Sequence, residues 1–315
     1  MKRRLAFTAL ALLLCTAVFA DLLASDLPLA VRVDGATFVL PAVTQPPELR
    51  DATHAMLAAR AEWMLAAPIP FGPNHTFATA LSRSEQAPWA PDGEHLLGTD
   101  ELGRDVLARL IHGARVSLAI GFGAVLIAVL VGLFLGVIAG WYGGLLDATI
   151  SRLTEITFTF PTFFFFIALA AMIRFTTVLP LVIVMGLTRW TDIARLVRAE
   201  TLKLKELDFV LAARVLGASS PRLLVKHVVP NALPPVLVAA TFGVASAILL
   251  ESALAFLGIG VPPPTASWGE LLIQGHRYLV HPGAWWLAVF PGLAVAGTVL
   301  TMNLVGQALQ DLQSR

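Results

Sequence analysis

The sequence predicts an all-α membrane protein with six transmembrane helices and a small extracytoplasmic lobe between the first two. Three observations support this. Hydrophobic residues make up 57% of the 315-residue chain and charged residues only 14%, against about 45–50% and about 25% in soluble domains. Apolar stretches long enough to span a bilayer, about 20 residues each, recur along the chain. Lys and Arg lie beside particular stretches, which gives them an orientation.

Six apolar stretches are predicted to span the membrane. The second of them contains no charged residue, as expected for a segment that crosses the hydrocarbon core. The six stretches cover residues 5–23, 116–142, 156–173, 175–193, 233–259 and 284–304.

Basic residues predict the orientation of these spans. Lys2, Arg3 and Arg4 precede the first span and place the N-terminus in the cytoplasm. An even number of spans then brings a second basic segment to the same side, and six spans return the C-terminus there. The basic residues of that segment are Arg195, Arg198, Lys203, Lys205, Arg214, Arg222 and Lys226.

The N-terminus has a second interpretation. A basic start, an apolar run and Ala17-Val18-Phe19-Ala20 before Asp21 are also typical of a cleavable signal peptide. The residues themselves leave open whether this stretch is cleaved before Asp21 or remains as an anchor.

A long region, residues 24 to 114, separates the first two spans. Asp34-Gly35 between two short β-type runs predicts a hairpin, and the alanine-rich stretch 53–65 is predicted to be helical. A connection of this length without its own structure is uncommon, so we expect a small lobe. It either contacts a substrate-delivery protein or is a solvated linker that caps the membrane domain.

A basic, polar segment at residues 208–235 interrupts the apolar sequence. Helical spacing on both sides of Gly217 predicts two short helices, because glycine accepts the left-handed backbone that ends a helix. Ser220 and Pro221 are predicted as the N-cap and first residue of the second helix, which Pro230 is predicted to stop. Such a helix–turn–helix knob suits the docking of a soluble partner, although an ordinary charged loop shares the pattern.

This segment resembles the cytoplasmic coupling motif of ABC importer permeases, Glu-Ala-Ala-x-x-x-Gly followed by Ile-x-Leu-Pro. Leu211 stands in place of the Glu, which removes one polar contact to the partner, and Val229 stands in place of the Leu before the proline. The resemblance implies that the segment couples the chain to ATPase subunits. The coupling residues it implies are Leu211, Ala212, Ala213, Gly217, Ala218, Pro230 and Asn231.

A second motif, Gly-Thr-Asp-Glu-Leu-Gly-Arg-Asp at residues 98–105, precedes the second span. By composition alone it could be an interfacial cap in which Arg104 and Arg109 extend to water while Leu102, Val106 and Leu110 face lipid. It resembles the Gly-Thr-Asp-x-x-Gly-Arg-Asp signature of dipeptide and oligopeptide permeases. The signature and extracytoplasmic residues implied are Gly98, Thr99, Asp100, Gly103, Arg104, Asp105, Trp268 and Gly269.

The resemblance continues in family order over residues 96–306. Its further elements are Tyr142-Gly143-Gly144 with Asp147, Phe160-Pro161, Phe256-Leu257-Gly258, Pro262-Pro263 and Phe290-Pro291-Gly292. The run Gly306 to Asp311 departs from the acidic ending usual in the family, so no function is assigned to it. Residues 23–26, 33–35, 67–72 and 269–275 resemble the extended-loop subfamily that includes the microcin C importer, whose members take up oligopeptides and peptide-like compounds.

The resemblance implies the type I ABC importer permease fold in a bacterial inner membrane. The expected partners are a homologous permease, two ABC ATPase subunits and an extracytoplasmic substrate-binding protein. An uncleaved N-terminal anchor fits this family better than a signal peptide. The expected domains are a transmembrane anchor at 1–24, the lobe and signature at 25–114, a five-helix core with coupling helices at 208–230 in 115–306, and a cytoplasmic tail at 307–315.

Two further features lie inside the predicted spans. Gly132, Gly136 and Gly140 recur four apart on one helix face, where small residues let helices approach closely; we favour this packing role over a pathway role. Glu251 is a carboxylate in an apolar span, at a cost of roughly 2.5–3.5 kcal/mol. A hydrogen bond to a neighbouring helix and a gate or pathway contact are both open interpretations.

The sequence predicts no catalytic residues, cofactor or metal ion. It contains no G-x-x-x-x-G-K-[ST] loop, so ATP hydrolysis is expected on separate subunits. Cys15 is the only cysteine and the net charge is +1, which gives no cysteine metal site and no nucleic-acid role. An intramembrane enzyme is the alternative class, but Ser117, Ser246 and Ser252 have no evident histidine partner in the spans. A permease for another solute class is the second alternative, and an ion channel would not need a docking knob.

Overall fold

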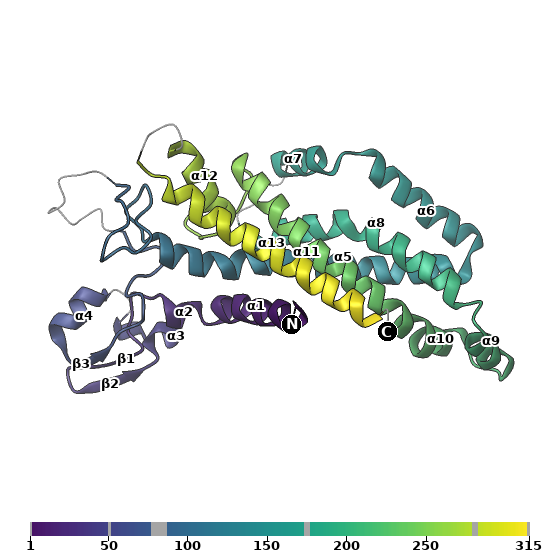
Figure 1. Cartoon of the computed structure of the whole chain (residues 1–315), viewed down its shortest axis with the longest axis horizontal. Helices are drawn as coiled ribbons and strands as arrows, with labels where there is room; N and C mark the ends of the chain where they lie inside the picture. Colours follow the sequence, from purple (N-terminus) through teal and green to yellow (C-terminus); the bar gives the residue numbers. More distant parts are fainter. Residues whose placement is uncertain (1, 50–51, 77–86, 173–176, 279–282, 314–315) are drawn as a thin grey trace. The chain divides into compact units, whose positions relative to one another are not determined.

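The computed structural model describes residues 2–49, 52–76, 87–172, 177–278 and 283–313. Long helices dominate it, and a three-stranded sheet lies in its N-terminal part (Figure 1). The chain divides into two compact units, and helices α1 (Lys2–Val18), α5, α11 and α13 contribute residues to both. Unit 1 contains residues Met1–Thr8, Ala119–Leu250 and Val299–Arg315, and unit 2 contains Ala9–Leu118 and Glu251–Thr298.

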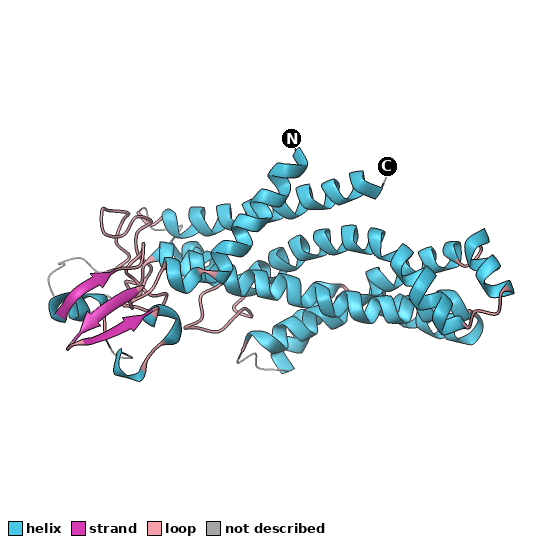
Figure 2. Ribbon diagram, turned by 90° about the horizontal axis from the view of Figure 1, so that it is seen from below, coloured by secondary structure: helices cyan, strands magenta, loops and turns pink. Residues whose placement is uncertain are grey.

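The first part of unit 2 is a small α/β lobe. Strand β1 (Ala30–Val33) lies between β2 (Ala36–Val39) and β3 (Ala61–Leu65), with antiparallel pairing to both (Figure 2). Asp34 and Gly35 form the turn of the β1–β2 hairpin with φ of 51° and 79°. Positive φ at both residues is what a type I′ turn requires, so the predicted hairpin is confirmed. Short helices α2 (Ala20–Leu23), α3 (Pro41–Thr44) and η1 (Pro47–Leu49) complete the lobe.

The alanine-rich stretch 53–65 is only partly helical. Thr53 caps helix α4 (His54–Arg60) by accepting a hydrogen bond from the Met56 amide at 3.4 Å, and the chain then enters β3. Met64 pairs with Val31 of β1 and packs on the buried core of the lobe. The prediction of a helix through residue 65 is wrong, because strand pairing and this packing outweigh the helix propensity of the segment.

The N-terminal stretch forms two helices rather than one. Helix α1 (Lys2–Val18) ends before Phe19, whose φ of −93° and ψ of 19° interrupt the helix, and α2 follows. The predicted first span, 5–23, covers both helices.

Three helices of the described residues are long and apolar enough to cross a membrane. These are α5 (Val106–Tyr142), α11 (Val229–Phe256) with the helical turns before it, and α13 (Trp286–Gln313). They contain most of the predicted spans 116–142, 233–259 and 284–304. Helix α8 (Val178–Leu204) contains most of the predicted fourth span and continues through basic residues; the predicted boundaries at 173 and 175 lie outside the described residues.

The predicted third span is broken. Helices α6 (Gly144–Thr159) and α7 (Thr162–Met172) meet at 87°. Phe160 between them has extended backbone angles of −88° and 124°, as expected for a residue before proline, because the Pro161 ring disfavours the helical region there. The prediction of one continuous span at 156–173 is therefore wrong, and the pair counts as a fourth, bent candidate span.

Three further short helical elements follow α8 and α11. They are α9 (Asp208–Val215), α10 (Ser220–Leu223) with the π-helical turn η2 (Leu224–Val228), and α12 (Trp268–Tyr278).

Candidate functional site

A knob formed by α9, α10 and the turn between them contains five of the seven predicted coupling residues, and the other two, Pro230 and Asn231, lie at the start of α11. Helix α9 ends in a Schellman motif, in which the amides of Gly217 and Ala218 donate to the carbonyls of Arg214 and Ala213 at 3.0 and 3.1 Å. Gly217 has a φ of +85°, so its predicted left-handed conformation is confirmed. The side chains of Val215 and Leu216 are 88% and 87% exposed, which gives the knob an apolar tip.

Two details of the knob differ from prediction. Ser219, not Ser220, is the N-cap of α10, and Pro221 is the second helical residue. Proline fits there because the first amides of a helix have no intrahelical acceptor. Pro230 does not stop the helix, which runs without interruption from Ser220 to Phe256. The π-helical turn η2 ends at Val228, two residues before Pro230, and its wider spacing accommodates a residue that cannot continue the α-helical hydrogen-bond pattern.

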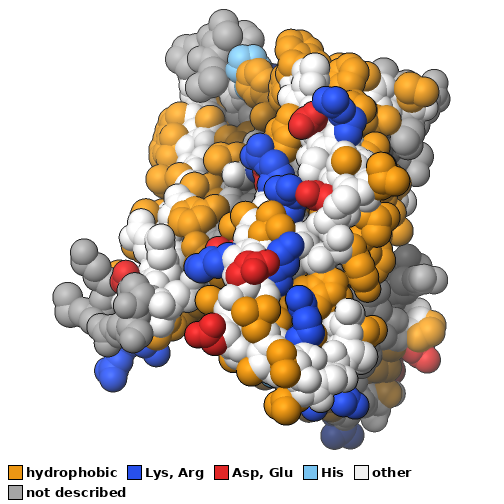
Figure 3. Space-filling model, turned by 90° about the vertical axis from the view of Figure 1, so that its right-hand side faces the viewer, with side chains coloured by type: hydrophobic (Ala, Val, Ile, Leu, Met, Phe, Trp, Pro, Cys, Tyr) orange, Lys and Arg blue, Asp and Glu red, His pale blue; other side chains and the backbone are white. Residues whose placement is uncertain are grey.

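The base of the knob contacts other parts of unit 1. Val210 is fully buried, and the rings of Phe209 and His227 lie 6.0 Å apart. The guanidinium of Arg214 lies 4.9 Å from the ring centre of Trp141, at the end of α5, which is cation–π geometry. Figure 3 faces the end of the molecule with α9 and α10, where several Lys and Arg side chains are exposed.

A bidentate ion pair joins α6 to α8 nearby. The Arg198 guanidinium donates to both carboxylate oxygens of Asp147, at 2.7 Å for the Nη2–Oδ2 pair. Lys205 Nζ donates to the Gly140 carbonyl at 3.3 Å. Asp147 belongs to a motif quoted from the sequence, but its partner was not predicted, because the two residues lie 51 positions apart.

The three predicted packing glycines of α5 face α8. A Cβ added to Gly132 would lie 2.6 Å from the Ile193 Cβ, and one added to Gly136 would lie 2.6 Å from the Ala194 carbonyl oxygen. At Gly140 it would lie 2.7 Å from the Thr201 Cβ. A side chain has no room at any of these positions, which supports a packing role.

The signature residues 98–105 form a hydrogen-bonded turn before α5 in unit 2. Asp100 Oδ1 accepts from the amides of Leu102 and Arg104 at 2.9 and 3.0 Å, and Gly98 and Gly103 have positive φ. Asp105 caps α5 by accepting from the Ala108 amide at 2.7 Å.

Other residues of the signature are buried by contacts that sequence did not reveal. Asp105 Oδ2 lies 2.9 Å from Nδ1 of the buried His95. The Thr99 hydroxyl accepts from the Trp89 amide at 2.8 Å, and the Thr99 carbonyl accepts from the Trp286 indole at 3.1 Å.

The interpretation of the signature arginines as extended toward water is wrong. Arg104 is 4% and Arg109 0% exposed. Both turn inward because carboxylates lie there: Arg104 Nε donates to Asp100 at 2.7 Å, and Arg109 Nη2 donates to Glu270 at 2.6 Å. Val106, expected to face lipid in that interpretation, is fully buried, and Leu102 is exposed.

Trp268, Gly269 and Glu251 meet at the start of α12. The Trp268 amide donates to Ser117 Oγ at 3.1 Å, and its indole donates to the Leu110 carbonyl at 3.0 Å. Glu251 is fully buried, and its Oε1 accepts from Ser267 Oγ at 2.9 Å. One Glu251 oxygen thus has the hydrogen bond expected for a structural role, while a pathway role remains a prediction.

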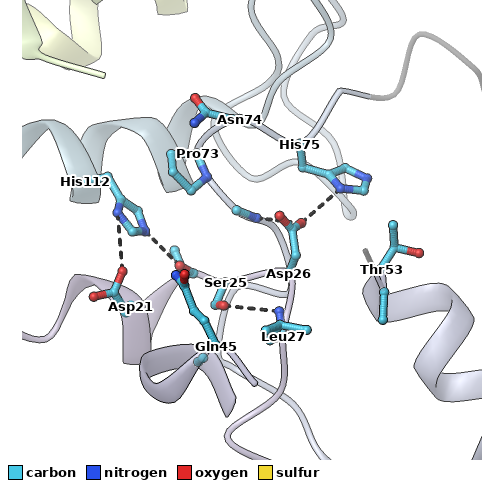
Figure 4. Close-up of a pocket in the computed structure, with 14 residues that line it drawn as sticks. Asp21, Ser25, Asp26, Leu27, Gln45, Thr53, Pro73, Asn74, His75 and His112 are labelled. Atoms are coloured by element: carbon cyan, nitrogen blue, oxygen red, sulfur yellow. Dashed lines mark hydrogen bonds and ion pairs between the residues drawn. The ribbon is translucent and has the colours of Figure 1, made fainter. Parts of the chain in front are cut away.

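A cavity of about 430 Å³ lies in unit 2, between the lobe and the start of α5 (Figure 4). Asp26 accepts from the Gly72 amide and lies 2.9 Å from Nδ1 of His75. The hydrogen bond that His75 donates to Asp26 raises the pKa of His75 above its ordinary 6.5, because the carboxylate favours the charged imidazole. The cavity was not predicted, since its walls come from separate parts of the sequence.

The described residues contain no cluster of His, Cys, Asp or Glu suited to a metal ion. Ser117, one of the serines considered for an intramembrane enzyme, accepts the Trp268 amide.

Sequence comparison places the chain in a family. The family described as "Binding-protein-dependent transport system inner membrane component" matches residues 132–315. A putative peptide transport system permease protein of Brucella suis biovar 1 is 41% identical over 222 residues, 70% of this chain and 74% of that protein. The dipeptide transport system permease protein DppC of Alkalihalophilus pseudofirmus is 38% identical over 221 residues, 70% of this chain and 72% of that protein.

A solved structure has the same fold. A chain of the MetNI methionine ABC transporter, in an inward-facing conformation, aligns with a TM-score of 0.50 over 65% of this chain and 97% of its own length. At 20% identity, this likeness concerns the fold, which is that of ABC importer permeases of the MetNI type. By its sequence match and its relatives, the chain belongs to the family of inner membrane components of binding-protein-dependent transport systems.

Proposed function

We propose that this chain is the permease subunit of an ATP-driven importer of oligopeptides or peptide-like compounds. The named relatives at 41% and 38% identity are peptide and dipeptide permeases, which supports this substrate class over other solutes. The observation that carries the proposal is the knob of α9 and α10, whose apolar tip at Val215 and Leu216 is almost fully exposed. Such a tip fits a groove on a soluble partner.

The proposed assembly supplies what this chain lacks. A homologous permease completes the translocation path, two ABC ATPase subunits bind the coupling knobs, and an extracytoplasmic binding protein delivers substrate. The ATPase subunits hydrolyse ATP, and their closure moves the knob. The spans then alternate between inward-open and outward-open states.

The proposed topology has six spans with both termini in the cytoplasm of a bacterial cell. α1 with α2 is the first span, the bent pair α6 and α7 the third, and α8 the fourth, with α5, α11 and α13 completing the set. The domain scheme remains an anchor at 1–24, an extracytoplasmic lobe and signature at 25–114, a permease core at 115–306 and a tail at 307–315.

Cysteine labelling tests this topology in a Cys15→Ser background. Gly35→Cys and Thr265→Cys should react with an impermeant maleimide in intact cells. Ser219→Cys, on the knob, should react only after the membrane is permeabilised. Reaction of Ser219→Cys in intact cells would contradict the topology.

The coupling function is tested by substitution of Gly217. Its φ of +85° is strained for any L side chain, although no atom lies within 4 Å of the position that a Cβ would take. A β-branched residue there costs about 1–3 kcal/mol, so Gly217→Val should distort the knob and leave the spans in place. Uptake of a labelled tripeptide into proteoliposomes that contain the full complex should fall sharply. ATP hydrolysis should lose its stimulation by the loaded binding protein.

Gly217→Asn is the matched control. Asparagine tolerates the left-handed region far better than valine, so this variant should retain most of both activities at equal membrane level. Wild-type uptake and stimulation in Gly217→Val would show that the knob is an ordinary loop.

A further inference from the structure

We propose that α12 is a clamp that joins the ends of three long helices in unit 2, and that Arg109 is the positioning residue that holds it. The three ends are residues 106–118 of α5, 251–256 of α11 and 286–298 of α13. The clamp itself follows from contacts within unit 2, and only its bearing on transport rests on the proposed function.

Helix α12 packs on all three ends through positions without a side chain. A Cβ on Gly113 of α5 would lie 3.2 Å from the Trp268 ring. A Cβ on Gly269 would lie 2.7 Å from the Ala255 Cβ of α11, and one on Gly275 would lie 2.6 Å from the Leu287 carbonyl oxygen of α13. Because two of these glycines are on α12 itself, the helix lies nearly backbone-to-backbone against its neighbours.

Hydrogen bonds fix the start of α12 to α5 and α11. Ser267 Oγ accepts from the Glu270 amide at 3.1 Å, which caps the helix, and donates to Glu251 of α11 at 2.9 Å. The Trp268 amide donates to Ser117 of α5 at 3.1 Å. One serine therefore both starts α12 and attaches it to a neighbouring helix.

Arg109 connects three segments from inside this junction. Its Nη2 donates to Glu270 of α12 at 2.6 Å, and its Nη1 donates to the Pro73 carbonyl at 2.8 Å. Its Nε lies 3.3 Å from Asp100 Oδ2. The planar guanidinium presents donors in fixed directions, so its two hydrogen bonds set the positions of Glu270 and the Pro73 carbonyl. Its Nε has no hydrogen-bond partner, so Asp100 is held by the ion pair alone.

The charges around Arg109 are balanced. Arg104 pairs with Asp100 at 2.7 Å, so two arginines face two carboxylates, Asp100 and Glu270, and all four side chains are less than 10% exposed. Breaking such a buried pair leaves an uncompensated charge, which is far more disruptive than loss of a surface pair. The residue at position 109 should therefore control whether α12 remains packed against the ends of α5, α11 and α13.

Hydrogen exchange of the full chain in lipid nanodiscs tests this role. In Arg109→Ala, the amides of α12 should exchange on the order of a hundredfold faster than in wild type. Arg109→Lys keeps the positive charge but loses the planar guanidinium with its fixed donors, so we expect a smaller acceleration of amide exchange in α12. Arg277→Ala, on the same helix, removes an exposed pair with Glu101 at 3.3 Å and should leave exchange in the first two turns of α12 unchanged.

Equal exchange in wild type and Arg109→Ala, or equal acceleration in Arg277→Ala, would overturn the proposal. If the Arg109→Ala chain does not insert into the membrane, hydrogen exchange of Arg109→Lys and Ser117→Ala tests the clamp instead. In both of these, unchanged exchange of α12 counts against the clamp.

Uptake separates positioning from general damage. At matched membrane level, Arg109→Lys should lower the maximal uptake rate of a labelled tripeptide and leave the half-saturating concentration unchanged. The maximal rate of Arg109→Lys should nevertheless be higher than that of Arg109→Ala. A changed half-saturating concentration with a normal maximal rate would contradict a positioning role. Failure of the wild-type chain to support tripeptide uptake would count against the proposed function, while the exchange result would still decide the clamp.

Discussion

The seam between α5 and α8 in unit 1 and the clamp around α12 in unit 2 join helices differently: both use close contacts at glycines, and the clamp adds a buried ionic network. In the seam, Gly132, Gly136 and Gly140 bring α5 against the backbone and β-carbons of α8. In the clamp, buried charges and hydroxyl groups hold a short helix in place. Close packing gives association where hydrocarbon removes the hydrophobic driving force, whereas a buried ionic network fixes a specific geometry and tolerates little change.

The two regions should therefore fail differently. Loss of one charge in the clamp leaves another charge unpaired, so single substitutions there have large effects. The seam responds mainly to added volume. Three substitutions test this difference, and a fourth in the lobe provides a partly exposed ion pair for comparison; they are given from the largest expected effect to the smallest.

Asp100→Asn should be the most destabilising. It removes the carboxylate that faces both Arg104 and Arg109, and Asp100 is fully buried. We expect the free energy of unfolding in mixed micelles to fall by about 3–5 kcal/mol. The control is Asp34→Asn, which breaks an ion pair with Arg60 whose side chains are 65% and 70% exposed and should cost less than about 1 kcal/mol. Equal losses would remove the distinction between buried and surface charge.

Gly136→Leu should disrupt the seam. The new Cβ would lie 2.6 Å from the Ala194 carbonyl oxygen, and relief requires the two helices to separate. The free energy of unfolding should fall by about 1–3 kcal/mol or more, and the yield of assembled complex should drop. Gly297→Leu in α13 is the matched control, since no atom lies within 4 Å of its added Cβ. Normal stability and assembly of Gly136→Leu would refute the packing role of the seam.

Ser267→Ala should weaken the start of α12. It removes the cap of the Glu270 amide and the donor to Glu251, at a cost of about 1–2 kcal/mol in unfolding free energy. Ser267→Thr keeps the hydroxyl and should recover most of the loss. If threonine and alanine behave alike, the hydroxyl does not hold the helix.

The smallest effect should come from the lobe, at His75. The hydrogen bond that His75 donates to Asp26 raises the pKa of His75 above 6.5, so the charged pair stabilises the folded state fully below pH 6.5. That contribution is lost as the pH rises through the higher folded-state pKa. The unfolding midpoints of wild type and His75→Gln should differ at about pH 5 and converge by about pH 9. A difference independent of pH would contradict the ion pair.

Local features of the fold could be predicted because neighbouring residues determine them. The Asp34-Gly35 hairpin and the left-handed Gly217 depend on the φ values that those residues tolerate. Residues 53–65 show the limit of this reasoning, since the same alanine-rich pattern suits a helix and a half-buried strand. Only pairing with β1 decided that the second half is a strand.

The candidate site shows the same division. The proposed coupling and signature residues were predicted from motifs, but the partners of Arg109 were not, because Arg109 and Glu270 are 161 positions apart. Burial of both side chains was unpredictable for the same reason: a lone arginine beside a membrane span is expected to reach water. The ion pair of Asp147 with Arg198 was missed in the same way.

The sequence by itself determined the membrane class, the knob and the small-residue face of α5, because apolar run length, glycine conformation and helical periodicity are local properties. The tertiary structure alone decided where α12 sits, which charges are neutralised and how the helix passes Pro230. Those outcomes depend on groups far apart in the sequence that meet only when burial makes an unpaired charge or hydrogen-bonding group costly.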